Sequence, residues 1–214
     1  DAWSREKKMR YLSFDCDRQF GSVLLEIIKS PEIQTRFQAL FNAFRNDGKL
    51  ADVMVAASVL KLLGFDKPRD FLISELLDSS YLYSLDFKRN PVGKELLQLG
   101  SGHIIPRSSV LAKYGLTSFS DSRSVVDRLI KIATKAHDLG RDSQMFFGIY
   151  KELVTFSMLQ SMLPEKGKRD ALIRFYEAIK NLEAAQSHPH FWLQYAIARL
   201  ASDGPGDLEK ARLF

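Results

Sequence analysis

Residues 50–63 form a fourteen-residue segment, LADVMVAASVLKLL, that is apolar nearly all round a helix. A helix needs about 18 apolar residues to span a bilayer, so this segment is too short to cross one. A helix that is apolar on every side belongs in the centre of a domain, where other elements cover it. The sequence therefore predicts a mainly α-helical fold around this helix, with Gly64 as its C-terminal cap.

Two more helices and a hairpin are expected directly after this central helix. Helical patterns over 67–78 and 79–88 come first. The former places four apolar side chains on its inner face: Phe71, Leu72, Leu76 and Leu77. Two apolar runs then flank a Gly-Ser-Gly turn, which predicts a β-hairpin with strands at 96–99 and 103–106.

This order of elements is typical of a winged helix. A helix over 108–118, capped by Ser108 or Ser109, completes it. We therefore assign residues 48–118 to a winged-helix-like domain with a small β-hairpin, and residues 1–47 to a helical lead-in.

From residue 121 onward the chain is expected to form helical hairpins. Helical segments of similar length recur over 121–140, 141–163, 168–186 and 190–214, joined by short turns rich in Gly, Pro or Asp. The stretch 143–163 favours one long helix. Antiparallel helices of this kind stack side by side, so residues 119–214 are predicted to form a helical-repeat segment.

The first of these helices, capped by Asp121 or Ser122, is amphipathic. Seven residues form its expected core stripe: Val125, Val126, Leu129, Ile130, Ile132, Ala133 and Ala136. Its opposite face carries charge: Arg123, Asp127, Arg128, Lys131 and Lys135.

The last helical pair sets an expectation about the surface. Its first helix carries Trp192 and Tyr195, a Gly-Asp turn follows, and the chain stops within a second helix at Phe214. Such a pair buries its apolar face only by stacking on a neighbour. We therefore expect the repeat segment to be truncated at its C-terminus, with Trp192, Tyr195 and Phe214 as its interaction residues.

Composition bears on where the chain acts. A single cysteine, Cys16, excludes an internal disulfide and fits a reducing compartment. No apolar run is long enough to span a membrane, and no signal peptide is visible. These features favour the cytoplasm and exclude a membrane partner.

DNA is the usual ligand of a winged helix, and it is bound through Lys and Arg side chains. The predicted helix over 67–78 carries two cations but also three acids, and the hairpin tip is uncharged. A solvated surface rich in Lys accounts for the net charge of +5. Nucleic acid is therefore not the expected partner.

No motif in the chain predicts catalysis. The P-loop and the serine elbow G-x-S-x-G are both absent from the sequence. His188 and His190 flank a proline and are expected to form a corner between helices. Asp15, Cys16 and Asp17 mix soft and hard ligands, which rarely select one metal. We expect no enzyme activity, no metal and no cofactor in this chain itself.

Three stretches resemble a known family. They read FLISELLDSSYLYSLDF with GHIIPRSSVLAKYGL, then KRDALIRFYEAIKNLEAAQSHPHFWLQYAIARLA, then DLEKARLF. Together they resemble the region that follows the P-loop ATPase core in bacterial STAND-type NTPases. These are antiphage defence proteins that often carry a sirtuin-like or nuclease effector domain. The resemblance extends from residue 18 to the end of the chain.

The resemblance implies a nucleotide-dependent switch. In this family the winged helix folds over the nucleotide of the closed, resting state, and the ATPase core of the parent protein holds ATP or ADP with Mg²⁺. A histidine after the hairpin often senses the diphosphate. The stretch 105–110 has no histidine, but Arg107 offers a guanidinium there, and Ser108 and Ser109 add donors at a helix start. The alternative is a helix cap with a surface arginine.

The last helical pair also resembles a tetratricopeptide repeat (TPR), although 202–205 insert residues that break the register, so we call it TPR-like. The implied function is a non-catalytic regulatory and sensor segment of a STAND NTPase. The helical array would bind a protein ligand, such as a phage protein, and free the parent NTPase to form a homo-oligomer. Two alternatives stay open, which are a winged-helix transcription regulator with a helical ligand domain and a helical-repeat adaptor between proteins.

Overall fold

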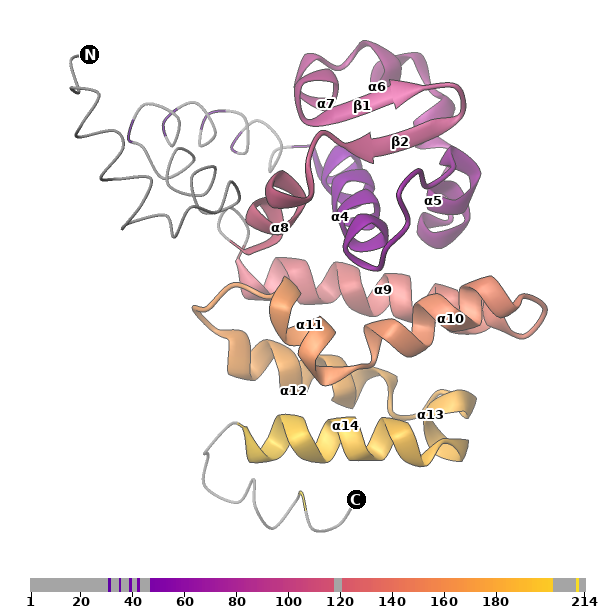
Figure 1. Cartoon of the computed structure of the whole chain (residues 1–214), viewed down its shortest axis with the longest axis vertical. Helices are drawn as coiled ribbons and strands as arrows, with labels where there is room; N and C mark the ends of the chain where they lie inside the picture. Colours follow the sequence, from indigo (N-terminus) through magenta and orange to yellow (C-terminus); the bar gives the residue numbers. More distant parts are fainter. Residues whose placement is uncertain are drawn as a thin grey trace, which may run out of the picture. The chain divides into compact units, whose positions relative to one another are not determined.

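The computed structural model describes residues 47–117 and 121–201, together with the single positions 31, 35, 39, 42 and 211. The described part of the compact unit Phe44–Phe214 contains eleven α-helices and a small antiparallel sheet (Figure 1). The predicted mainly α fold with one hairpin is confirmed. The helical lead-in over 1–47, the Asp15–Asp17 cluster, the turn at 206–207 and Phe214 lie outside the described residues, apart from the positions just given.

The first half of this unit has short elements around one long helix. In chain order they are α4 (Gly48–Leu62), α5 (Asp70–Leu77), the 3₁₀ turn η2 (Tyr81–Tyr83), α6 (Leu85–Arg89), α7 (Pro91–Leu96), β1 (Leu97–Gly100), β2 (His103–Pro106) and α8 (Ser109–Thr117). The second half contains α9 (Ser122–Gly140), α10 (Gln144–Leu153), α11 (Phe156–Met162), α12 (Lys168–Ile179), α13 (Glu183–Ser187) and α14 (Pro189–Leu200).

Helix α4 is the predicted central helix. Ten of its fifteen residues are buried, because α5, β2, α8 and α9 all pack against it. Asp47 caps its start by accepting a hydrogen bond from the Leu50 N–H at 3.0 Å. Gly64, with a φ of +90°, ends it, and the Phe65 N–H donates back to the Leu60 carbonyl at 2.9 Å. The prediction for this segment is confirmed.

The hairpin draws a third segment into its sheet. Its turn has only two central residues, Ser101 and Gly102, both with positive φ. On its other edge, β2 pairs with the stretch before α5. The Ile104 N–H donates to the Pro68 carbonyl at 3.2 Å, and Arg69 forms a β-bridge with His103. An extended stretch between α4 and α5 thus adds to β2.

This pairing corrects the predicted inner face of the second helix. Because Pro68 and Arg69 are extended, α5 starts at Asp70 and not at residue 67. Phe71 lies in its first turn and is 45% exposed, whereas Ile73 is fully buried. The prediction of Phe71 on the inner face is wrong.

Helix α9 lies between the two halves. It packs against α4 and α5 in the first half and against α10 and α12 in the second, as can be followed in Figure 1. Six of its seven predicted core residues are buried, and Ile130 is half-buried. Helix α12 in turn packs against α14, so α9, α12 and α14 form successive layers.

The predicted single helix over 143–163 is wrong, because the chain breaks between α10 and α11. The Tyr176 hydroxyl donates to the Val154 carbonyl at 2.8 Å. The Phe156 N–H, at the start of α11, donates to the Gln194 side chain at 2.8 Å. Side chains from α12 and α14 therefore satisfy the backbone groups that the break leaves open.

Aromatic side chains fill the core between α12 and α14. The rings of Tyr176 and Tyr195 stack with centroids 5.3 Å apart, and Phe191 meets Tyr176 edge to face at 5.7 Å. All three are buried.

None of the described helices combines the length and the apolar character needed to cross a bilayer.

Two buried tyrosines make a matched test of this packing. Tyr150 is 3% exposed, and its hydroxyl has no hydrogen-bond partner among the described residues, while Tyr176 donates to Val154. We expect Tyr176→Phe to lower the free energy of unfolding by about 1–3 kcal/mol, because it leaves a buried carbonyl unpaired. Tyr150→Phe should leave stability unchanged or raise it. Urea unfolding of both variants checks this, and an equal loss in both would contradict it.

Candidate functional site

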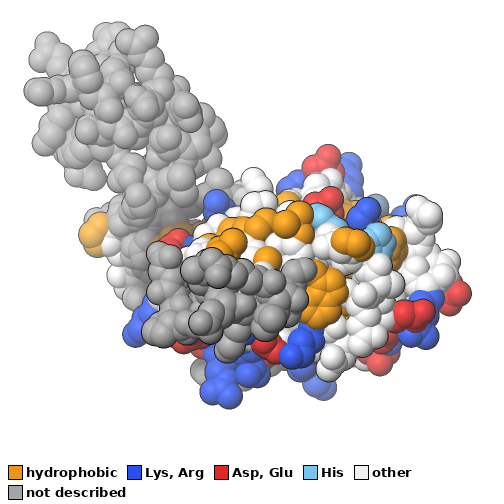
Figure 2. Space-filling view, turned by 90° about the horizontal axis from the view of Figure 1, so that it is seen from below, with side chains coloured by type: hydrophobic (Ala, Val, Ile, Leu, Met, Phe, Trp, Pro, Cys, Tyr) orange, Lys and Arg blue, Asp and Glu red, His pale blue; other side chains and the backbone are white. Residues whose placement is uncertain are grey.

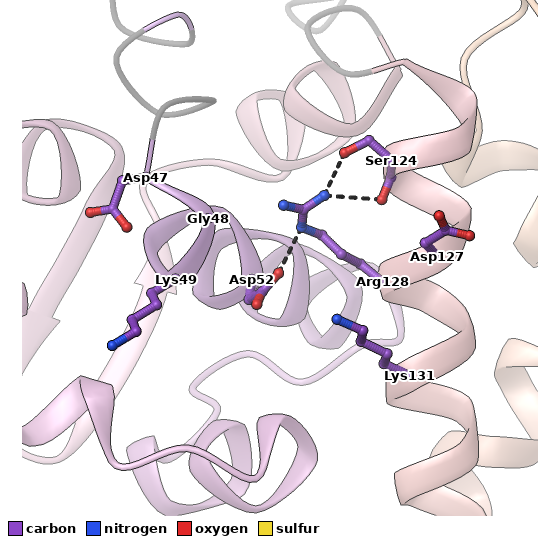
Figure 3. A pocket seen from close by; sticks show the side chains of 8 residues that line it. All are labelled: Asp47, Gly48, Lys49, Asp52, Ser124, Asp127, Arg128 and Lys131. Atoms are coloured by element: carbon purple, nitrogen blue, oxygen red, sulfur yellow. Dashed lines mark hydrogen bonds and ion pairs between the residues drawn. The ribbon is translucent and has the colours of Figure 1, made fainter.

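A charged groove runs along the outer face of α9. It joins three hollows of about 840, 920 and 960 Å³. The first lies between α4 and α9 (Figure 3), the second between α9, α12 and α14, and the third beside the turn before α12. The first two share the lining residues Asp127 and Lys131, and the last two share Asp170 and Arg174, so the hollows adjoin one another along α9. We call this surface the α9 groove.

The predicted charged face of α9 lines this groove. Four of the five residues of that face take part: Arg123, Asp127, Arg128 and Lys131. Their spacing of three and four residues puts them on one side of the helix, while the apolar stripe faces the core. The local pattern therefore predicted the face, although it gave no sign of what lies opposite.

Arg128 connects the two halves of the unit at the first hollow. Its Nε donates to Asp52 Oδ1 on α4 at 2.7 Å, and its Nη1 donates to the Ser124 carbonyl at 3.1 Å and to the Ser124 hydroxyl (Figure 3). The Arg128 and Asp52 side chains are 22% and 36% exposed. A second ion pair joins Lys135 to Asp78, the residue that ends α5, at 3.4 Å.

Ion pairs also cross the second hollow. Arg174 Nε on α12 donates to Asp127 Oδ1 on α9 at 2.7 Å. Glu177, one turn further along α12, accepts from Arg199 Nη2 on α14 at 2.7 Å and from the Tyr195 hydroxyl. These contacts tie α9, α12 and α14 together along the groove.

The charges around Glu177 shift two pKa values. Hydrogen bonds from Lys180 and Tyr195, with Arg199 adding to them, lower the pKa of Glu177 to about 2. Burial, followed by the neighbouring Glu177 carboxylate, raises the pKa of Tyr195 to about 12. At neutral pH Glu177 is therefore ionised and Tyr195 keeps its proton.

The three residues predicted to contact nucleotide phosphate lie together between β2 and α8. Arg107 is exposed, and its Nη2 donates to the Lys94 carbonyl of α7 at 2.8 Å. The Ser108 hydroxyl accepts from the Leu111 N–H at 3.0 Å and so caps α8, whose first residue is the exposed Ser109. In this structure the Arg107 contact joins the end of the hairpin to α7, and the Ser108 contact caps the start of α8.

The predicted interaction residues of α14 differ in their exposure. Tyr195 is fully buried, and Trp192 is half-buried with its ring 5.3 Å from that of Phe191. The exposed apolar side chains of this helix are Leu193 and Leu200, at 58% and 50%, and sequence reasoning missed them. Their spacing of seven residues on one helix face was the available signal. Figure 2 shows apolar side chains gathered on this side of the molecule.

The described residues offer no site for a metal ion. No group of three or more His, Cys, Asp or Glu side chains there is arranged to hold one. His188 and His190 are both exposed at the start of α14.

We expect Asp52 and Arg128 to be energetically coupled. In a double-mutant cycle with Asp52→Ala and Arg128→Ala, the coupling energy should be about 0.5–1 kcal/mol, since the pair is only partly exposed. It should fall as salt is added. The matched control is the Lys61–Asp66 pair, whose Asp66 is 93% exposed and whose coupling should be near zero. Equal coupling in both pairs, measured by urea unfolding, would argue against a link between the halves at Arg128.

The lowered pKa of Glu177 predicts a loss of stability in acid. A carboxyl group whose pKa is lower in the folded state than in the unfolded state stabilises the fold above its unfolded value. That contribution is lost as the pH falls from about 4.5 towards the folded value of about 2. The difference in unfolding free energy between the wild type and Glu177→Gln should therefore shrink across this range. A difference that stays constant with pH would show that Glu177 acts by packing alone.

Comparison with known proteins gives no relative for this chain. No protein-family model matches it, and no curated protein and no solved structure matches it significantly. What the α9 groove does must follow from its own residues.

Proposed function

We propose that this chain is a non-catalytic coupling segment. The helical stack α9–α14 binds a protein ligand, and α9 carries the effect of binding to the winged-helix-like unit α4–α8. The observation that supports this is the position of α9, whose packing is shared between α4 and α5 on one side and α10 and α12 on the other. A ligand that favours one position of α9 also favours one arrangement of α4 and α5.

The order of elements around the hairpin supports the winged-helix-like assignment. Helices α4 and α5 precede the hairpin and α8 follows it, as the sequence predicted for such a fold. Pro68 and Arg69, between α4 and α5, pair with β2 and so join the first two helices to the hairpin. The layering of α9, α12 and α14 likewise supports a TPR-like stack.

The resemblance to STAND-type NTPases gives this coupling a setting. We propose that the segment regulates a P-loop ATPase in bacterial antiphage defence, acting in the cytoplasm, with ATP or ADP and Mg²⁺ held by the ATPase core. Release of the winged-helix-like unit from the nucleotide would then allow homo-oligomer formation. Arg107, Ser108 and Ser109 would face the phosphates in that assembly.

DNA readout is the less favoured alternative. The stretch between α5 and β1 holds only a 3₁₀ turn and two helices of five and six residues, in place of one recognition helix. Its exposed charged side chains are mixed in sign, with Asp86 and Glu95 beside Lys88, Arg89 and Lys94, and its exposed Tyr83 and Leu85 are uncharged. The third possibility is an adaptor that uses the same α9 coupling without any nucleotide.

The test uses the longer NTPase that the resemblance implies. Arg128→Asp places two acids opposite each other and weakens the link between α9 and α4. We expect it to change the amount of ADP retained per protomer and the distribution of oligomers, and we expect the exchange Asp52→Arg with Arg128→Asp to restore both. Lys61→Asp on α4 is the matched control, since it also replaces a basic side chain by an acidic one but does so at a different ion pair, Lys61 with Asp66.

The three functions predict different results. ADP retention that is unaltered by Arg128→Asp would rule out nucleotide coupling and leave the adaptor. Duplex DNA binding by the chain that falls steeply with salt would instead support the transcription regulator. An unchanged ADP content after Arg107→Ala would remove that residue from the mechanism.

A further inference from the structure

The strongest unassigned feature is the imbalance of available charge in the α9 groove. We propose that the groove is the docking site for an acidic, extended protein segment. This inference rests on the proposed coupling function and names the chemistry of the ligand that the helical stack would take. Three observations support it. Most acids of the groove already form ion pairs or cap helices, several of its cations form no ion pair among the described residues, and two aliphatic side chains help to line it.

Most acids of the groove already form an ion pair or cap a helix. The three hollows are lined by seven acidic side chains. Four of them form ion pairs, with Arg128, Arg174, Arg199 and Lys168 as partners. Two more, Asp47 and Asp121, cap α4 and α9. Asp170 is the single acid of the groove without such a contact among the described residues.

Several cations of the groove remain available. Arg123, Lys131 and Lys166 are exposed and have no ion pair or side-chain hydrogen bond within the described part of the chain. They are spread along the groove, because Lys131 lines the first two hollows and the other two line the third. A ligand with carboxylates at intervals would match these donors.

The shape and the total charge favour a protein segment over nucleic acid. The lining of the second hollow includes two half-buried aliphatic side chains, Ile130 and Ile173, which can contact an apolar side chain of the ligand. With eight basic and seven acidic side chains, the groove as a whole is nearly neutral. A phosphate backbone would meet those acids along its length, whereas a peptide can place its carboxylates only at the free cations.

A selection experiment tests the proposal without a known ligand. The intact chain is used to select from a phage-displayed random peptide library. We expect the selected peptides to be enriched in Asp and Glu and to contain an aliphatic residue. Binding of one labelled selected peptide is then measured by fluorescence anisotropy.

Matched charge reversals localise the binding. Lys131→Glu should weaken binding by about tenfold, since it removes one charge-assisted contact. Arg123→Glu, at the other end of the groove, should also weaken it. Lys151→Glu makes the same change of charge at an exposed site on α10 outside the three hollows and should leave binding unchanged. Circular dichroism confirms that each variant is folded.

Three outcomes would overturn the docking site. These are selected peptides without acidic enrichment, equal weakening by Lys131→Glu and Lys151→Glu, and displacement of the peptide by a duplex oligonucleotide that binds more tightly. Hydrogen exchange in α4 and α5 separates this proposal from the coupling function. Peptide binding that depends on Lys131 but leaves exchange there unchanged would support the docking site and contradict the coupling.

Discussion

Burial of α4 is the constraint on which the first half of this protein depends. Its residues from Leu50 to Leu60 are covered on all sides except at Asp52, where the groove begins. Fully burying one such aliphatic side chain contributes about 1.5–3 kcal/mol, so the helix is stable only when it is enclosed. The hairpin, α5 and α8 are too short to be stable alone, and each is ordered by covering one side of α4.

The remaining side of α4 is covered by α9, and this has a consequence for function. Since α10 and α12 also pack against α9, the two halves share one helix. Its polar face is left for the groove, where Arg128 and Arg174 pair with acids on α4 and on α9 itself. A ligand in this groove would contact both halves at the point where they meet.

Predictions from local chemistry were accurate. The helix caps, the stop at Gly64 and the existence of the hairpin all depend on residues within a few positions of one another. Of the two candidate caps offered for each helix, Asp121 and Ser108 are the ones used, and the hairpin forms with its first strand at Leu97–Gly100 and a turn one residue shorter than expected. The charged face of α9 was predictable for the same reason, because a periodicity of 3.6 residues is a local property.

Predictions failed where side chains distant in the sequence change the backbone conformation that the local sequence favours. The helix expected over 143–163 breaks because Tyr176 and Gln194, 22 and 38 residues away from their partners, satisfy the backbone there. The bond between Arg128 and Asp52 spans 76 positions, so no local pattern contains it. The sequence alone determined which faces are apolar, where helices begin and which residues turn the chain, since these follow from side-chain size and backbone geometry. Only the tertiary structure decided which charged residues face one another across α9, because ion pairing depends on distances that folding sets.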